Sequence, residues 1–264
     1  MQTGKVIEHI VGWLKDYAIQ AGMKGYVVGC SGGIDSGVVS TLAAMTGLKV
    51  LLLEMPIRQK QDHVDRAWDH IDDLKSRFKN VEAMSVDLNK SFDQLFETFD
   101  AANTTNPNKN LALANARSRL RMITLYYYGQ LNGLLVAGTG NFIEDACIGF
   151  FTKYGDGGVD VSPIGDLYKS EVYLLADQLN VIKSIREATP TDGLWDTNAS
   201  DEQQIGATYP ELEKIQKEYG TKTADDYTGR DKEVYLIFDR MHRRALHKIN
   251  PIPVCTIPHN FKGL

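Results

Sequence analysis

Two kinds of hydrophobic pattern alternate along this chain. Apolar residues recur at helical spacing over residues 5–21, 61–78, 111–129 and 169–179. Between these segments lie short, continuous apolar runs over residues 26–28, 49–55 and 134–137, which are typical of strands buried on both sides of a sheet, and residues 80–88 are a further strand candidate. This alternation predicts an α/β fold, a doubly wound parallel sheet with helices on both faces.

The last third of the chain is less regular. We expect a turn over residues 190–195, a polar helix over 209–219, an amphipathic helix over 231–247 and then a proline-stiffened tail. The chain has no internal repeat and no low-complexity tract, and its 264 residues can enclose a substantial core. The sequence therefore predicts a single domain over residues 1–264.

The first predicted strand is followed by a glycine-rich loop that leads into a helical segment. The loop consists of Gly29, Cys30, Ser31, Gly32, Gly33, Ile34, Asp35 and Ser36. Glycines let the backbone approach a ligand, and the unpaired N–H groups and the dipole of a helix N-terminus favour a phosphate. Asp35 would repel a phosphate unless a cation such as Mg²⁺ lay between them. A tight turn without a ligand is the plainer interpretation, but the full pattern favours an anion site.

A second glycine turn, residues 138–141, follows the strand predicted over 134–137. Because parallel strands end at the same edge of a sheet, this turn and the first loop can face one cleft. The segment 155–165 is too rich in glycine and proline for a helix or strand, yet acidic residues lie there beside the aromatic residues Phe150, Phe151 and Tyr154. We interpret it as a partly buried loop that lines a pocket.

The composition narrows the class of protein. Lys and Arg number 29 and Asp and Glu 34, so the net charge of −5 provides no broad basic surface for a nucleic acid. Cys30, Cys147 and Cys255 are too widely spaced for a metal-type pair or a disulfide framework. The sequence has neither a secretion-signal pattern at its start nor an apolar run of membrane-spanning length. We expect a cytoplasmic protein that binds neither nucleic acid nor membrane.

Several segments taken together resemble the NAD⁺ synthetases. The pattern Ser-Gly-Gly-x-Asp-Ser alone resembles that of all ATP pyrophosphatases, enzymes that split ATP between its α and β phosphates. The pattern Phe-Thr-Lys-Tyr-Gly-Asp-Gly-Gly is far more specific. The matching segments are residues 31–36, 117–122, 138–141, 151–158, 162–169 and 247–248, and the resemblance extends from about Lys5 to Pro253.

This resemblance implies a Rossmann-like fold of the ATP-pyrophosphatase type and an ATP-dependent amidation. The implied reaction joins the nicotinate carboxylate of deamido-NAD⁺ to AMP, releases pyrophosphate, and lets ammonia displace AMP to give NAD⁺. ATP is then the co-substrate and Mg²⁺ the metal ion. The charge on the phosphates must be held while pyrophosphate leaves, which suits a glycine loop with Mg²⁺.

The resemblance also assigns roles to individual residues. It implies ATP contacts from the glycine loop, Gly29 to Ser36, and from Thr139, Lys169 and Thr191. Asp35 and Glu144 match the metal ligands. Asp145 is an alternative to Glu144, because the interval between Glu144 and Phe150 is one residue longer than in some relatives.

Five further residues match positions around deamido-NAD⁺: Arg119, Lys153, Asp160, His247 and Lys248. Asp156 and Lys153 are the implied catalytic residues, and Asp156 would bind ammonium and accept its proton, since only neutral ammonia is nucleophilic. Lys169 and His247 would also suit ordinary helix ends. Arg117 and Arg121 are expected to be structural, and Cys30 to be a small buried residue rather than a nucleophile.

Ammonia rather than glutamine is the expected nitrogen source. Glutamine-dependent relatives carry an amidase domain before the glycine loop, where this sequence has only residues 1–28. A separate glutaminase subunit is the alternative. The family also implies a homodimer, with the aromatic-rich helix over 111–129 as a candidate contact. Two other functions remain open: a different pyrophosphate-loop enzyme, GMP-synthetase-like or tRNA-modifying, and a nucleotide-binding regulatory protein without turnover.

Overall fold

Four parallel strands form the centre of the protein. The computed structural model describes residues 1–191 and 200–262, so the turn predicted over 190–195 lies outside the described residues from position 192 onward. The strands lie in the order β3-β2-β1-β4, with neighbours all parallel; they are β1 (Gly25–Gly29), β2 (Lys49–Glu54), β3 (Val81–Ser85) and β4 (Leu135–Val136). The chain builds outward from β1 to β3 and then returns to place β4 on the other side of β1. The strand order therefore reverses between β1 and β4, where such sheets bind their ligands.

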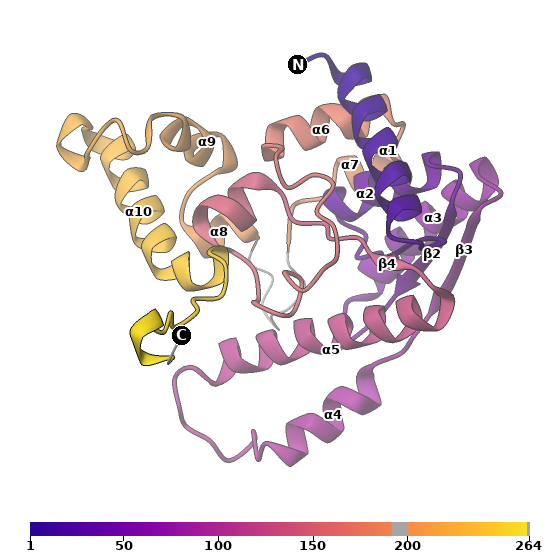
Figure 1. Cartoon of the computed structure of the whole chain (residues 1–264), viewed down its shortest axis with the longest axis horizontal. Helices are drawn as coiled ribbons and strands as arrows, with labels where there is room; N and C mark the ends of the chain where they lie inside the picture. Colours follow the sequence, from indigo (N-terminus) through magenta and orange to yellow (C-terminus); the bar gives the residue numbers. More distant parts are fainter. Residues whose placement is uncertain (192–199, 263–264) are drawn as a thin grey trace.

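Alternate side chains of the strands enter two separate cores. Val28 and Leu52 pack into the larger core, beneath α1 (Thr3–Gln20), α2 (Ile34–Met45), α3 (Gln61–Arg77), α6 (Lys169–Gln178) and α7 (Lys183–Arg186). Val27 and Leu51 face the opposite side, where they meet α4 (Asn89–Thr98) and α5 (Lys109–Asn132). Figure 1 shows helices on both sides of the sheet. The predicted doubly wound architecture is confirmed.

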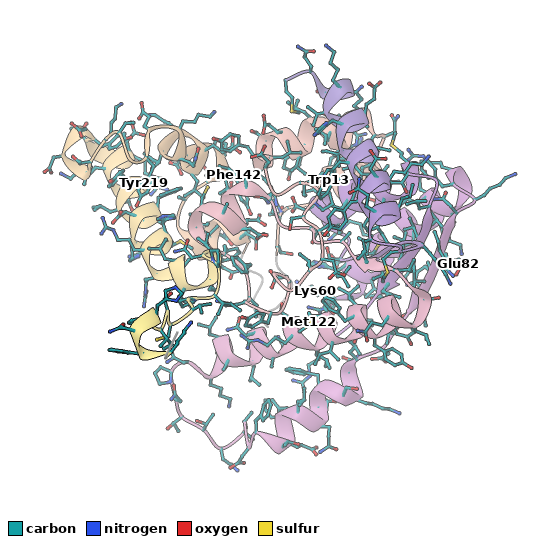
Figure 2. All side chains as sticks on the ribbon, viewed as in Figure 1. Trp13, Lys60, Glu82, Met122, Phe142 and Tyr219 are labelled. Carbon is teal, nitrogen blue, oxygen red and sulfur yellow. The ribbon has the colours of Figure 1, made fainter. Side chains whose placement is uncertain are left out.

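The C-terminal helices enclose a third hydrophobic cluster beside the sheet. It is built by α8 (Asp201–Ile205), α9 (Tyr209–Glu218), α10 (Gly229–Ile249) and the helix η1 (Phe142–Ile148). Figure 2 labels Phe142 and Tyr219, which pack against this cluster. Two single-turn helices, η2 (Ala224–Asp226) and η3 (His259–Phe261), complete this part. Across the described residues, no helix combines the length and the apolar character needed to cross a bilayer.

The helix η1 is a π-helix, which the sequence analysis did not predict. It starts immediately after the second glycine turn, and the Asn141 side chain caps it by accepting a hydrogen bond from the Glu144 backbone N–H at 3.2 Å. A π-turn contains more residues than an α-turn and occurs often at functional sites. Side chains along this turn therefore do not follow the ordinary α-helical period.

Candidate active site

A cavity of about 250 Å³ opens where the strand order reverses, at the carboxyl ends of β1 and β4. Its wall includes both glycine turns, the start of α6, the loop after η1, and Met122, which Figure 2 labels on α5. The expected ATP-binding residues that line it are Gly29, Cys30, Ser31, Gly33, Ile34, Asp35, Ser36, Thr139, Lys169 and Thr191. The structure therefore brings these expected residues to one crevice.

Gly32 is the member of the glycine loop that turns away from the cavity. Its φ of +78° lies in the left-handed region, and a Cβ there would come within 2.8 Å of the His63 carbonyl oxygen. Only glycine suits this backbone. The turn then presents the first residues of α2 to the cavity, as an anion site at a helix N-terminus requires.

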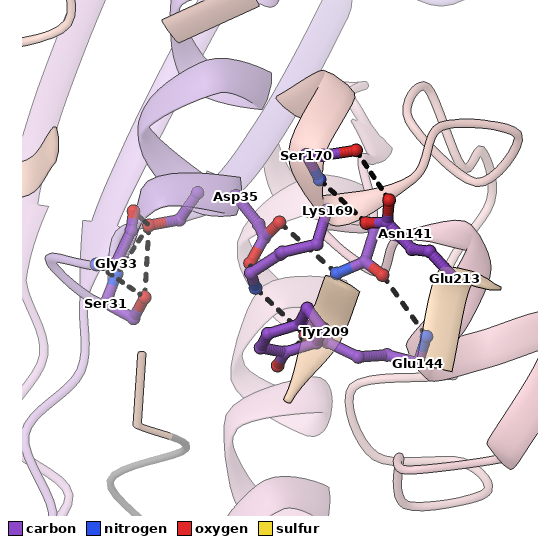
Figure 3. A network of polar contacts seen from close by, with 10 residues as sticks. Ser31, Gly33, Asp35, Asn141, Glu144, Lys169, Ser170, Tyr209 and Glu213 are labelled. Atoms are coloured by element: carbon purple, nitrogen blue, oxygen red, sulfur yellow. Dashed lines mark hydrogen bonds and ion pairs between the residues drawn. The ribbon is translucent and has the colours of Figure 1, made fainter. Parts of the chain in front are cut away.

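The two serines of the loop are held by hydrogen bonds to the loop itself. The Oγ atoms of Ser31 and Ser36 lie 3.0 Å apart, Ser31 Oγ accepts from the Gly33 N–H at 3.2 Å, and Ser36 Oγ donates to the Gly33 carbonyl at 2.9 Å. Figure 3 shows this group at the side of the network. Hydrogen bonds within the loop therefore hold its shape.

Cys30 lines the cavity as a buried, free cysteine. Burial, with a smaller contribution from Glu54, raises the pKa of its thiol to about 12. A thiol that stays protonated is a poor nucleophile. This agrees with the expectation that Cys30 is a small packing residue.

An ammonium group joins the two carboxylates expected to hold a metal ion. Lys169 Nζ lies 2.6 Å from Asp35 Oδ2 and 2.9 Å from Glu144 Oε1, and the Lys169 side chain is only 3% exposed (Figure 3). Burial would lower the pKa of Lys169, but the two carboxylates outweigh it and raise that pKa. Lys169 is therefore charged, and α2, η1 and α6 are tied together at this point.

Two residues that the sequence analysis did not assign complete this centre. The Tyr209 hydroxyl donates to Glu144 Oε1 at 2.5 Å, and Asn141 Nδ2 donates to Asp35 Oδ1 at 3.4 Å. Burial alone would raise the pKa of Glu144, but Lys169 and Tyr209 lower it, so this carboxylate is ionised. Asn141 lies in the glycine turn noted from the sequence. Tyr209 carried no signal beyond its place at the start of a helix.

The π-helix directs both Glu144 and Asp145 into the cavity. The ammonium of Lys169 is shared by Asp35 and Glu144, whereas the Asp145 carboxylate packs against Gly140, where a Cβ would come within 1.8 Å of Asp145 Oδ2. Burial, together with the nearby Glu144, raises the pKa of Asp145 well above its ordinary value. This geometry favours Glu144 over Asp145 as the partner of Asp35.

The donor set at Asp35 and Glu144 fits Mg²⁺. Their oxygens already converge on one cation, and carboxylates are the protein ligands that Mg²⁺ commonly takes. Within the described residues, no group of three or more His, Cys, Asp or Glu side chains is arranged to hold a metal ion. Mg²⁺ usually binds one or two carboxylates and takes its other ligands from substrate phosphates and water.

Asp156 reaches the cavity from the loop after η1. Its Oδ1 accepts hydrogen bonds from Ser118 Oγ at 2.7 Å and from the Thr152 N–H at 2.9 Å, while its own N–H donates to Ser118 Oγ at 2.8 Å. Thr152 in turn donates its hydroxyl to Asn115 Oδ1 at 2.6 Å. Helix α5 thus positions the loop. The sequence analysis assigned no role to Asn115 or Ser118, although Ser118 lies in the segment 117–122 that carries part of the family resemblance.

Comparison with known proteins settles which family this architecture represents. The family model described as NAD synthase matches residues 6–251. The chain belongs to the NAD synthase family. A curated relative, the NH₃-dependent NAD⁺ synthetase of Finegoldia magna, is 37% identical over 227 residues, which cover 85% of this chain and 89% of the relative. The resemblance found in the sequence is confirmed.

Solved structures agree with the NAD synthase fold. The NMN synthetase of Francisella tularensis superimposes with a TM-score of 0.83 at 30% identity, covering 98% of this chain and 99% of the other. The NH₃-dependent NAD synthetase of Campylobacter jejuni gives a TM-score of 0.76 at 26% identity, covering 97% and 100%. The alignment with the Campylobacter jejuni structure covers that protein over its full length.

The residues that the family resemblance places around deamido-NAD⁺ lie outside the wall of this cavity, as far as the described residues define it. Each is engaged locally. Arg119 Nε donates to the Lys153 carbonyl at 3.2 Å, Lys153 Nζ donates to the His247 carbonyl at 2.5 Å, and Lys248 Nζ donates to the Phe151 carbonyl at 2.6 Å. These contacts join α5, the loop after η1 and the end of α10.

Asp160, the fifth of these residues, is held at the end of β4. Its carboxylate accepts from the Val136 N–H at 2.8 Å and from the Tyr126 hydroxyl at 3.0 Å. Both oxygens thus have a donor, one from the sheet and one from α5. Its observed contacts are those of a residue that fixes the loop to the sheet.

Proposed function

We propose that this protein catalyses the ATP-dependent amidation of deamido-NAD⁺ to NAD⁺ with ammonia, the final step of NAD⁺ biosynthesis. The carboxylate would first be joined to AMP with release of pyrophosphate, and ammonia would then displace AMP. The relatives named NH₃-dependent NAD⁺ synthetase support this activity. The observation that carries it is the meeting of the glycine loop, the Asp35–Glu144 pair and Asp156 in one cavity.

The glycine loop and Lys169 would act on ATP. The N–H groups at the start of α2 suit the phosphates, because they are preformed donors at a helix N-terminus, and the hydrogen bonds of Ser31 and Ser36 within the loop hold the turn that presents them. Asp35 and Glu144 would hold Mg²⁺, which supplies charge neutralisation at the phosphates when bound. Thr139 and Thr191, on the cavity wall, would orient the nucleotide.

Asp156 would act on the nitrogen nucleophile. Ammonium must lose a proton before it can attack, and a carboxylate within the cavity can hold the cation and accept that proton. The Ser118 and Thr152 hydrogen bonds occupy Asp156 Oδ1, and Oδ2 receives none from the described residues. That second oxygen is the one we assign to ammonium. Lys153, the other catalytic residue implied by the resemblance, lies on the same loop but outside the wall of this cavity as the described residues define it, with its ammonium held by the His247 carbonyl.

The direct test is product formation from defined substrates. The purified protein is incubated with ATP, Mg²⁺, ammonium and deamido-NAD⁺, and AMP and NAD⁺ are quantified by chromatography. Equal amounts of the two products are expected, without added glutamine or a second protein. ATP binding without AMP formation would instead indicate a regulatory protein, and a requirement for glutamine plus another protein would refute direct use of ammonia.

A mononucleotide is the second candidate substrate. It is favoured by the similarity to the structure named NMN synthetase, with its TM-score of 0.83. Nicotinate mononucleotide carries the same reacting carboxylate as deamido-NAD⁺ but lacks the adenylate half. Competition between the two acids in one reaction gives the ratio of their kcat/KM values directly. A ratio favouring the mononucleotide would transfer the proposal to NMN synthesis.

The exposed face of α5 supports a homodimer with the dinucleotide near the contact. Ile123, Tyr127 and Leu131 are each more than half exposed and follow one another at four-residue intervals. Arg119, expected at deamido-NAD⁺, precedes them at the same interval and so shares this face. Sedimentation should give a dimer at micromolar protein, and Tyr127→Asp should shift it toward monomer. A wild-type protein that sediments only as monomer would reject the proposal.

The same reasoning extends to location. All three cysteines are free, and two of them are buried. Free thiols are usual in a reducing compartment. We therefore propose that the protein is located in the cytoplasm.

A further inference from the structure

The ammonium of Lys169 lies at the point where the two expected metal ligands converge. Its contacts to Asp35 at 2.6 Å and to Glu144 at 2.9 Å place it within reach of both carboxylates, and the residue as a whole is 2% exposed. The Tyr209 ring supports it from the side, with 4.9 Å between Nζ and the ring centroid. Mg²⁺ bound by the same oxygens would need this position, since its ligands lie at about 2.0–2.1 Å.

Lys169 can move without the helix that carries it. The next residue, Ser170, is anchored to Glu213 of α9, which accepts from the Ser170 N–H at 3.0 Å and from its hydroxyl at 2.7 Å (Figure 3). This fixes the backbone at the start of α6. The Lys169 side chain has four carbon atoms between that fixed backbone and the ammonium, so rotation of the side chain alone can shift the charge.

We propose that Lys169 is an internal counter-ion which holds Asp35 and Glu144 together before substrate binds, excludes free divalent cations from them, and yields its place when the metal arrives with the triphosphate. This rests on the proposed function. If a free divalent cation bound the two carboxylates, the buried ammonium of Lys169 would lose both of its carboxylate partners, which is strongly unfavourable. A triphosphate brings its own negative charge, to which the ammonium can transfer. The metal site is therefore built to accept the metal–nucleotide complex rather than the free ion.

The proposal is tested with Mn²⁺ as the probe and no nucleotide present. Free Mn²⁺ is followed by electron paramagnetic resonance in titrations of wild type, Lys169→Met and Lys169→Gln. Removing one positive charge at contact distance should tighten Mn²⁺ binding at least about 100-fold. Lys169→Gln retains hydrogen-bond donors for the carboxylates and is the variant that preserves folding if methionine does not. Lys183→Met, at an exposed lysine of α7 that pairs with Glu187, is the control with the same change in net charge.

A second substitution locates the gained site. Adding Glu144→Gln to either Lys169 variant should abolish the tight Mn²⁺ site, because one of its two carboxylates is then neutral. Thermal unfolding gives an independent readout: the Lys169 variants should melt lower than wild type in chelator and recover with Mn²⁺, whereas wild type and Lys183→Met should not respond. A variant that folds only when Mn²⁺ is added also supports the proposal.

Three results would overturn it. These are tight binding of free Mn²⁺ by wild type, unchanged Mn²⁺ affinity in both Lys169 variants, and a gained site that survives Glu144→Gln. None of these measurements involves turnover, so the two proposals fail separately. If the wild-type protein makes no NAD⁺ but its Lys169 variants gain the Mn²⁺ site, the proposed function fails and the counter-ion proposal stands. If the wild-type protein makes NAD⁺ but its Lys169 variants gain no Mn²⁺ site, the counter-ion proposal fails and the proposed function stands.

Discussion

Replacing Ser118 by alanine should change how the reaction depends on pH. Ser118 Oγ donates to Asp156 Oδ1 at 2.7 Å, one of two hydrogen bonds that stabilise this carboxylate in its charged form. Burial raises the pKa of Asp156, and the bonds from Ser118 and Thr152 oppose that rise. Without the Ser118 hydroxyl, the pKa of Asp156 should rise further and less of the base should be available at low pH.

The size of the shift follows from the energy of one bond. A hydrogen bond to a charged group contributes about 1.5–3 kcal/mol, which corresponds to about one to two pKa units. Solvent in the cavity can partly replace the lost donor, so we expect the lower value, about one unit. The ratio of the variant rate to the wild-type rate should then approach about 0.1 at low pH and rise to a constant value at high pH.

The assay measures initial NAD⁺ formation at saturating ATP and deamido-NAD⁺ from the lowest pH at which both proteins remain folded up to pH 9, with the same total ammonium for both proteins. Because both proteins meet the same ammonia concentration at each pH, the rate ratio cancels the titration of ammonium itself. Ser76→Ala, which removes an exposed hydroxyl on α3 that bonds the Asp73 carbonyl, is the matched control. A Ser118→Ala to wild-type ratio that stays constant across the pH range would refute the role of Asp156 as the proton acceptor.

Two further predictions concern stability. Burial lowers the pKa of His70 to about 4, below that of an unfolded histidine, so its contribution is present above pH 6.5 and is lost as pH falls toward 4. Between pH 7 and pH 5 this residue should lower the free energy of unfolding by about 2 kcal/mol. Urea titrations of His70→Gln should show a pH dependence of the unfolding free energy that is smaller by this amount. An identical pH dependence in wild type and variant would contradict the assignment. Gly155→Ala would place a Cβ within 2.2 Å of Ser118 Oγ and 2.9 Å of Thr152 Cβ, and should cost about 1–3 kcal/mol in thermal unfolding. Gly12→Ala, in open space within α1, should instead be neutral or stabilising, and equal stability of the two variants would refute the packing argument.

The local pattern of this sequence was sufficient for most of the fold. The strands β1, β2 and β4 appear as apolar runs because they are covered on both faces, whereas β3, at one edge of the sheet, is more polar and partly exposed. The helices that pack on the sheet show an apolar stripe or an apolar run. The glycine loop could also be found, since the left-handed φ of Gly32 and the approach of backbone to ligand restrict residue type locally. The roles proposed for Asp35, Glu144 and Asp156 required the family resemblance in addition.

Only the tertiary structure decided how the carboxylates are partnered. Asp35, Glu144, Lys169 and Tyr209 come from four elements far apart in the chain, so no spacing in the sequence encodes their 2.5–2.9 Å contacts. The choice between Glu144 and Asp145 likewise depended on a π-turn, in which side chains no longer follow the 3.6-residue period that sequence patterns assume. Local chemistry selects residue types along the chain, whereas the pairing of buried charges is set by which elements the fold brings together.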